Sequence, residues 1–359
     1  MINVTKPFLP PIEEYQKYVK EIWDRNWLTN NGPLVNELEL ELKQYLGLNH
    51  LLFVSNGTIA LQLALKVLGI KGEVITTPFS YVATTSSIVW EGCTPVFVDI
   101  DENTFNIDPK LIEQAITEKT TAIVATHVYG NPCAIDEIDA IAKKHKLKVI
   151  YDASHCFGTR YKGQSVLSYG DVSTISFHAT KLFHTTEGGA VVTQQPELLK
   201  ELALLRNFGH NGPEVFEGVG INAKNSEFHA GMGLANLKYA DHILNKRKVD
   251  YAIYDNWLAQ LNLQQPKVSA EAKFNYAYYP VVFQSEKDCL DVLKALEKEK
   301  IFARRYFYPV LSQLDYVDKV EMPKAESIAQ RILCLPLFEQ LTKSEIGMIC
   351  RIVLRTLNN

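Results

Sequence analysis

The sequence predicts an α/β fold built on a mostly parallel sheet that helices cover on both faces. Near-continuous apolar runs occur at four places that we expect to be strands, residues 74–77, 95–99, 121–128 and 148–152. Segments with helical spacing, at residues 83–90 and 135–145, lie between them. Strands that are apolar throughout and alternate with helices are typical of parallel sheets buried on both faces.

Further elements extend this pattern along the chain. The apolar residues 51–54 precede the first of these strands and lead into a predicted helix at 59–68. Asp108 is a suitable helix N-cap, and Pro109 fits the first position of a helix that would bury Ile112. These units repeat the strand–helix–strand order from which parallel sheets are built.

The pattern changes after about residue 200. Residues 207–225 are rich in glycine and asparagine, and residues 226–248 are predicted to form one long helix. Further on, the sequence predicts one strand and two helices, at residues 278–283, 288–298 and 343–354. Pro280 makes that strand an edge strand. We therefore expect a large domain at residues 1–245 and a small α+β domain at residues 246–359.

Composition excludes several classes of protein. At 359 residues and 47% hydrophobic, the chain is long enough for one large domain and a smaller one. A formal net charge of −4 provides no basic surface for nucleic acid or an anionic membrane. No apolar run approaches the ~20 residues that span a bilayer, and residues 1–7 lack the apolar core of a signal peptide. The six cysteines are scattered, so we expect reduced, mostly buried thiols in a cytoplasmic protein.

Lys181 has the most informative position in the chain. A β-rich stretch, residues 172–177, ends shortly before it, and Gly188 and Gly189 precede the next apolar run. The chain can therefore turn and hold the lysine at the rim of the sheet. A lysine amine forms a Schiff base with a carbonyl, and it is activated when desolvation lowers its pKa.

Asp152 ends the apolar strand at residues 148–152. Side chains at the carboxyl ends of strands face the ligand site of such sheets. A carboxylate there can pair with the N–H of a pyridine ring and keep the ring protonated, as pyridoxal phosphate (PLP) requires to act as an electron sink. Lys181 and Asp152 together therefore indicate a PLP enzyme. Cys156 is a possible nucleophile nearby, but a small buried core residue is the more usual role for such a cysteine.

A phosphate site is predicted at residues 55–58, Ser-Asn-Gly-Thr, directly before a helix. Free N–H groups and the positive end of the dipole attract phosphate to such a helix N-terminus, although a simple helix cap has the same sequence. Ser176 could bring a hydroxyl to the same phosphate. Phe79 and Tyr81 follow a strand, and they either offer a ring face for stacking or belong to the core.

Four ordered motifs strengthen these interpretations, at residues 55–58 (SNGT), 152–155 (DASH), 176–181 (SFHATK) and 187–189 (EGG). Together they resemble the DegT/DnrJ/EryC1/StrS family of PLP-dependent sugar aminotransferases. The resemblance covers nearly the whole chain, including residues 7–11, 27–33, 220–224 and 335–337. It implies the type I PLP fold of aspartate aminotransferase, with a mostly parallel central sheet and a smaller C-terminal α+β domain.

The resemblance implies a role for each matching residue. Lys181 is the Schiff-base lysine and carries the proton. Asp152 pairs with the pyridine nitrogen, and His155 takes the position that contacts the phenolic oxygen of the ring. Tyr81 occupies the place of the stacking aromatic.

The family's phosphate site implies a homodimer with shared active sites. Gly57, Thr58 and Ser176 would hold the cofactor phosphate. A segment of the partner subunit completes this pocket in the family, and Asn222 and Lys224 match that segment. The usual arginine is lysine here, which offers a single ammonium group in place of the planar guanidinium.

Lys181 also separates two branches of the family. One branch has histidine in its place and dehydrates sugars, whereas a lysine favours transamination. We expect L-glutamate as the amino donor and 2-oxoglutarate as its product. Residues 8–11, 27–33 and 176–189 most resemble the C4 aminotransferases of the family, which implies that the acceptor is dTDP-4-keto-6-deoxyglucose and the product dTDP-4-amino-4,6-dideoxyglucose, for surface polysaccharide such as O-antigen. A C3 aminotransferase acting on a dTDP-3-keto-6-deoxyhexose is the alternative.

Candidate substrate contacts lie in three places. Arg304 and Arg305, with Tyr306 and Tyr308, are suited to a nucleotide diphosphate, although two adjacent arginines can also be a solvated surface pair. His184 either faces the sugar or is structural. The remaining candidates come from the N-terminal motifs and are Phe8, Thr29 and Asn31.

Two other functions stay open at this point. A PLP-dependent dehydratase would share the same site, and the response of the cofactor to glutamate would distinguish it. A non-catalytic regulator is the other, but the chain offers no helix-turn-helix extension or basic patch for DNA. The nine histidines show no HxxxH spacing, so we expect no metal site.

Overall fold

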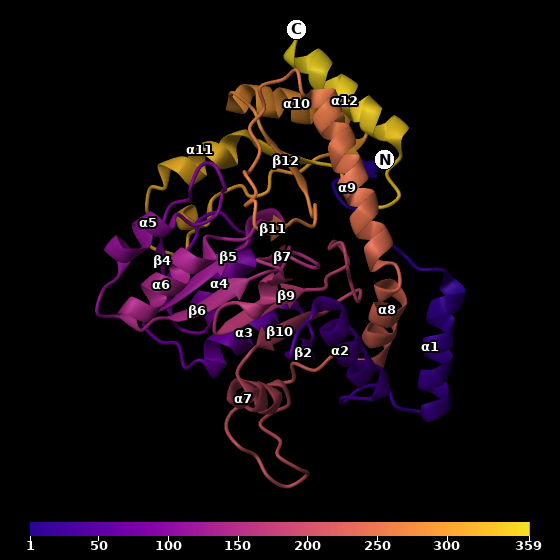
Figure 1. Ribbon diagram of the computed structural model, residues 1–359, viewed down its shortest axis with the longest axis vertical. Helices are drawn as coiled ribbons and strands as arrows, with labels where there is room; N and C mark the ends of the chain where they lie inside the picture. The colour runs from indigo at the N-terminus through magenta and orange to yellow at the C-terminus, as the bar shows by residue number, and fades with distance from the viewer. Residues whose placement is uncertain (359) are drawn as a thin grey trace.

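The computed structural model describes residues 1–358 and has a seven-stranded sheet at its centre (Figure 1). Only β10 runs against its two neighbours, and all the other pairs are parallel. The predicted α/β fold with a mostly parallel sheet is therefore confirmed. In sheet order the strands are β2 (His50–Val54), β10 (Gly189–Thr193), β9 (Val172–Ser176), β6 (Lys148–Asp152), β5 (Thr120–Thr126), β3 (Glu73–Thr76) and β4 (Thr94–Phe97).

Helices cover both faces of this sheet because alternate strand residues point to opposite sides. On β2, Phe53 packs into one hydrophobic core and Val54 into the other. The first core includes α2 (Pro33–Leu46), α6 (Ile135–His145) and α8 (Glu227–Leu237). The second includes α3 (Gly57–Val67), α4 (Val82–Trp90) and α7 (Pro196–Arg206). The remaining helices of this part are α1 (Ile12–Arg25), which packs beside α8, and the short α5 (Pro109–Ile112).

The C-terminal part has a core of its own, to which Ile2 from the N-terminal strand also belongs. The helix α9 (Ala240–Leu258) runs from the sheet towards this part (Figure 1). The other helices of the C-terminal part are α10 (Glu286–Lys298), α11 (Pro323–Arg331) and α12 (Lys343–Leu357). Its strands are β12 (Tyr279–Val282), which pairs with β14 (Ile332–Leu335), and β13 (Ile301–Phe302), which pairs with β1 (Ile2–Asn3). The predicted division between residues 245 and 246 falls inside α9 and stays a prediction. A small three-stranded sheet joins β11 (Ala272–Lys273), β7 (Arg160–Tyr161) and β8 (Gln164–Ser165).

The prediction of one helix over residues 226–248 is wrong, because two helices meet there. The first, α8, ends at Leu237, and α9 begins at Ala240. At the junction, Lys238 Nζ and Tyr239 Oη both donate hydrogen bonds to the carboxylate of Glu14 on α1. These contacts join segments far apart in the chain, so local periodicity gives no sign of the break. The predicted strand 121–128 also ends early, at Thr126, before a short turn.

Two further observations concern the chemistry of the chain. All six cysteines are buried, unpaired thiols, as expected. Across residues 1–358, none of the helices combines the length and the apolar character needed to cross a bilayer.

Candidate active site

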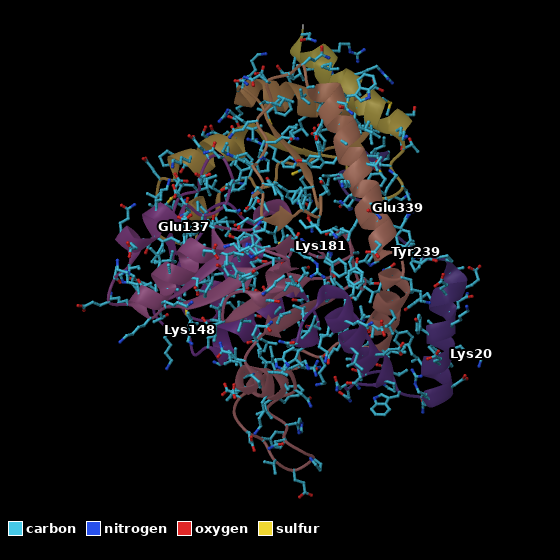
Figure 2. All side chains as sticks on the ribbon, in the orientation of Figure 1. Lys20, Glu137, Lys148, Lys181, Tyr239 and Glu339 are labelled. Atoms are coloured by element: carbon cyan, nitrogen blue, oxygen red, sulfur yellow. The ribbon has the colours of Figure 1, made fainter. Side chains whose placement is uncertain are left out.

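A cavity of about 570 Å³ opens at the carboxyl ends of the sheet strands, and it unites most of the predicted cofactor residues. Figure 2 labels Lys181 near the centre of the molecule, between the sheet and the C-terminal elements. The predicted residues that line the cavity are Gly57, Thr58, Tyr81, Asp152, His155, Ser176, Lys181, Arg304 and Tyr306. A larger cavity of about 880 Å³ lies beside α9, but none of the predicted residues lines it.

Lys181 lies in the connection between β9 and β10, and its side chain lines the cavity. Its backbone N–H donates to the carbonyl of His178 at 2.9 Å, which closes a turn. Burial lowers the pKa of the amine from 10.5 to about 8, and the negative charge of Asp152 offsets only part of this effect. Part of the side chain remains accessible. The amine is therefore available for reaction and is neutral in an appreciable fraction at physiological pH.

Asp152 is held by a chain of buried hydroxyls. Its Oδ2 accepts a hydrogen bond from Thr84 Oγ1 at 2.8 Å, and its Oδ1 accepts one from the Ser154 N–H at 3.1 Å. Behind Thr84, Ser80 Oγ lies 2.8 Å from Thr84 Oγ1 and 2.9 Å from Thr126 Oγ1. Because both carboxylate oxygens have fixed donors, the carboxylate is held in one orientation at the cavity wall.

His155 is neutral, with its proton on Nε2. Burial lowers the pKa of its ring well below the usual value, and the charge of Lys181 adds to the effect. The Nδ1 atom accepts a hydrogen bond from the backbone N–H of Tyr129 at 3.2 Å, so Nε2 must carry the proton. The ring is nearly parallel to that of Phe307 at 5.8 Å and meets the edge of Tyr278 at 4.9 Å. His155 is thus a hydrogen-bond donor with a fixed ring plane.

The N-terminus of α3 forms what we call the phosphate cradle, residues 55–58 together with Ser176. Asn56 caps the helix, with its Oδ1 accepting a backbone hydrogen bond at 2.9 Å. The first N–H groups of a helix have no partner within it, so those of Gly57 and Thr58 are left for an anion. A Cβ on Gly57 would lie 2.9 Å from the Cβ of Ser176. Only glycine therefore allows the helix to approach the serine hydroxyl this closely.

The two adjacent arginines point in different directions. Arg304 lines the cavity, with its guanidinium 5.0 Å from the centre of the Tyr306 ring. Arg305 instead donates to Glu286 at 2.9 Å and stacks on Tyr308 at 3.7 Å, away from the cavity lining. Arg304 is therefore the member of the pair that can contact a substrate in this cavity.

His184 is part of the scaffold. Its Nδ1 accepts a hydrogen bond from the Thr186 N–H at 3.1 Å, and its Nε2 donates to the carbonyl of Phe8 at 2.7 Å. Phe8 in turn packs against the Tyr239 ring at 5.1 Å. Of the two interpretations of His184, this geometry supports the structural one, and neither His184 nor Phe8 is part of the cavity lining.

Four other candidates also lie outside the cavity of the single chain. Thr29 and Asn31 are exposed, and Asn31 Oδ1 accepts a hydrogen bond from Arg206. Asn222 is exposed, and Lys224 Nζ donates to Asn207 Oδ1 at 2.6 Å. Substrate contacts by the first pair and cofactor contacts by the second stay predictions.

The sequence interpretation missed several cavity residues. The hydroxyls of Ser80 and Thr126 belong to the chain behind Asp152, and polar residues at the ends of apolar strands were the available signal. His178 and Glu187 flank the Lys181 turn, with Nε2 and Oε1 3.5 Å apart. Phe307 gave no local signal, because only the tertiary fold brings it to His155.

An amine that can react with a carbonyl, set at the edge of an α/β sheet beside a fixed carboxylate, is the chemistry of a PLP-dependent transferase. The chain belongs to the DegT/DnrJ/EryC1/StrS aminotransferase family, which matches residues 11–354. The predicted family, fold type and enzyme class are thereby confirmed.

Individual relatives match over almost their full length. The chain is 43% identical to a dTDP-4-amino-4,6-dideoxy-D-glucose transaminase of Shigella dysenteriae, with 97% of each chain covered. It is 33% identical to a GDP-perosamine synthase of Escherichia coli O157:H7, with 97% of this chain and 96% of the relative covered. The solved structure of DesI in the presence of its TDP-sugar product has a TM-score of 0.94 at 32% identity, covering 99% of this chain and 93% of DesI.

Proposed function

We propose that this aminotransferase uses PLP bound at Lys181 to transfer the amino group of L-glutamate to C4 of dTDP-4-keto-6-deoxyglucose. The observation that carries the proposal is the convergence of Lys181, Asp152, His155 and the phosphate cradle on one cavity. The name of the Shigella relative refers to a 4-amino product, which favours C4 over C3 amination. Lys181 itself favours transamination over dehydration.

The residues present fit the cofactor. The Asp152 carboxylate can pair with the pyridine N–H, and His155 Nε2–H can donate to the phenolic oxygen. Because Gly57 has no side chain, the N-terminus of α3 lies close to Ser176, so the free N–H groups of the helix and the serine hydroxyl can bind the same phosphate. Bound PLP supplies an electron-withdrawing ring that stabilises negative charge on the α-carbon of the amino donor.

Lys181 moves the proton. With a pKa of about 8, its Nζ can accept the α-proton of L-glutamate and then return it to a neighbouring carbon in the same cavity. Water would supply the keto oxygen of the departing 2-oxoglutarate, and the amino group would stay on the bound cofactor. The keto-sugar then receives the amino group as Lys181 carries a proton in the opposite direction. Arg304 is the side chain best placed to contact the diphosphate.

We further propose a cytoplasmic homodimer with shared sites, serving surface polysaccharide synthesis. The loop that follows α7, which includes residues 210–219, projects beyond this helix at the bottom of Figure 1. Val215, Phe216 and Val219 are exposed on this projection. Apolar side chains on a projecting segment are suited to packing against a second copy of the chain. Such packing would bring Asn222 and Lys224 of each protomer near its partner.

The absorption spectrum of the purified protein, before and after addition of L-glutamate, tests the proposal. The expected result is a visible band that glutamate converts to the band of the amine form. A band that glutamate leaves unchanged would point to a lyase or another amino donor. If no band formed even with added PLP, the assignments of Lys181 and Asp152 would be wrong. Incubation of the amine form with dTDP-keto-sugars would then distinguish C4 from C3 products.

A further inference from the structure

The strand that leads into the phosphate cradle is at the edge of the sheet. β2 pairs with β10 on one side only. An edge strand exposes backbone N–H and C=O groups that need other partners when they are buried. Phe53 is fully buried and lies one residue before the end of this strand. The partners of its free backbone groups therefore decide how firmly the strand end is held.

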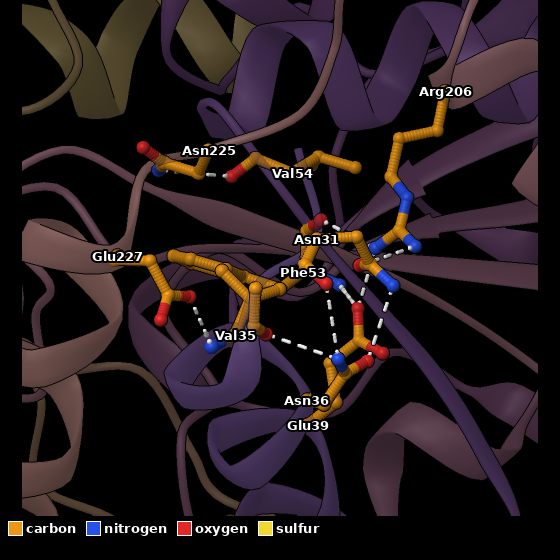
Figure 3. A network of polar contacts seen from close by, with 10 residues as sticks. Asn31, Val35, Asn36, Glu39, Phe53, Val54, Arg206, Asn225 and Glu227 are labelled. Carbon is orange, nitrogen blue, oxygen red and sulfur yellow. Dashed lines mark hydrogen bonds and ion pairs between the residues drawn. The ribbon is translucent and has the colours of Figure 1, made fainter. Parts of the chain in front are cut away.

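Those partners are the side chains of an ion pair. The Phe53 N–H donates to Glu39 Oε1 at 2.8 Å, and Arg206 Nη1 donates to the Phe53 carbonyl at 3.0 Å. The same guanidinium nitrogen also donates to Glu39 Oε1, so the four groups form a closed ring (Figure 3). Arg206 Nη2 reaches Asn31 Oδ1 at 3.1 Å. We call Glu39 and Arg206 the edge clamp, because they take the place of a neighbouring strand.

The edge clamp is shielded from solvent. The Arg206 side chain is 9% exposed and that of Glu39 is 13% exposed. Charge-assisted hydrogen bonds are strong when they are shielded from water. Removing one partner of a buried ion pair lowers the free energy of unfolding, because the other charge stays buried without a partner. The two residues come from different helices, α7 and α2, on either side of the strand end. The clamp therefore fixes β2 relative to both helices.

The cradle begins at Ser55, two residues after the clamped Phe53. Val54 O accepts from Asn225 Nδ2 at 3.4 Å, and the Ser55 N–H donates to Ala223 O at 2.9 Å. Gly57 then faces Ser176 at a distance that allows no side chain between them. A small shift of the strand end would therefore move the anion-binding N–H groups away from the serine hydroxyl. Neither Glu39 nor Arg206 lines the cavity itself.

We propose that Glu39 and Arg206 are positioning residues that set the affinity of the cradle for the cofactor phosphate without touching it. This inference rests on the proposed PLP site. The proposal also gives a structural role to Asn31, which the sequence predicted as a substrate contact. Asn31 supports the clamp by accepting a hydrogen bond from Arg206. The phosphate affinity is thus decided from outside the cavity, at the free edge of the sheet.

The test compares PLP with pyridoxal, which lacks the phosphate, on cofactor-free protein. Glu39→Gln keeps an acceptor for the Phe53 N–H but loses the charge that Arg206 meets. We expect the dissociation constant for PLP to rise about tenfold, the effect of one lost charge-assisted hydrogen bond, while that for pyridoxal stays within about twofold. Arg206→Lys keeps the positive charge but loses the forked guanidinium. Like Glu39→Gln, it should raise the dissociation constant for PLP about tenfold and leave that for pyridoxal within about twofold.

Glu286→Gln is the matched control, because it breaks the Arg305–Glu286 pair in the C-terminal part, at 2.9 Å. Both constants should stay at the wild-type values in this variant. If Glu39→Gln weakened PLP and pyridoxal equally, or weakened neither, the positioning role would be overturned. If the wild-type protein bound no PLP at all, the proposed function would fail, and the clamp proposal with it. Urea unfolding of each variant checks that the protein is folded under the conditions of the binding measurements.

Discussion

The two sides of the cavity are built differently. On the sheet side, Asp152, Ser176 and Lys181 follow or end neighbouring strands, and a chain of hydrogen bonds fixes the carboxylate. On the C-terminal side, the lining consists of aromatic rings such as Phe307 and one guanidinium, Arg304. The first side holds groups that can exchange or stabilise charge during the reaction. The second side offers aromatic rings and a guanidinium that a substrate can contact.

This difference suggests a division of tasks. Groups held by strand ends keep a fixed geometry, as proton transfer and charge stabilisation require. Arg304, by contrast, contacts the Tyr306 ring and, among the residues that the structure describes, none of the charged groups on the sheet side, so it can be changed without disturbing that geometry. We expect changes on the sheet side to reduce kcat, and changes on the C-terminal side to raise KM for the nucleotide sugar.

The largest effect is expected for Lys181→Ala. This change removes both the amine that binds the cofactor and the carrier of the proton, so turnover should fall by about 10⁴-fold or more. Single-turnover conversion of the amine form by a keto-sugar would measure it. A variant that kept the wild-type rate would show that the chemistry does not depend on the sheet side in this way.

Asp152→Asn should reduce kcat by roughly 10²- to 10³-fold, because the negative charge beside the pyridine nitrogen is lost. Thr84→Val removes only one hydrogen bond to that carboxylate and should cost about tenfold. Steady-state kinetics at saturating PLP would rank the two variants. Equal effects would mean that the hydroxyl chain, and not the charge, is what matters.

On the C-terminal side, Arg304→Met should raise KM for the dTDP-sugar about tenfold and leave kcat within about twofold. Arg305→Met is the matched control, because this neighbour contacts Glu286 and Tyr308 outside the cavity lining. Its KM should match that of the wild type. If Arg304→Met lowered kcat as strongly as Asp152→Asn, the proposed division between the two sides would be wrong.

The smallest effect concerns stability and needs no substrate. In the cofactor-free protein the pKa of Lys181 is about 8, against 10.5 in the ordinary lysine of an unfolded chain. Between pH 8 and 10.5 the unfolded state therefore binds more protons, so the stability contributed by Lys181 rises with pH across that window. Urea unfolding should show the wild type gaining stability relative to Lys181→Met. Parallel pH profiles for the two proteins would contradict the lowered pKa.

The sequence predicted the sheet side well because strand order alone places its residues. Asp152 and Ser176 end parallel neighbours, so the strand order alone brings these two positions to the same edge of the sheet. The choice between Arg304 and Arg305 could not be made in this way, because it depends on where Glu286 lies. The hydrogen bond between Asn31 and Arg206 was hidden for the same reason, since the two residues are far apart in the chain.

The six buried cysteines have a practical consequence for measuring assembly. Burial raises the pKa of every native thiol, and thiol reagents attack the thiolate. A single cysteine added at Lys20, whose side chain is 76% exposed on α1, would thus be labelled selectively in the folded protein. Donor and acceptor dyes at that position on mixed protomers would report subunit association by energy transfer, with the native cysteines left in place.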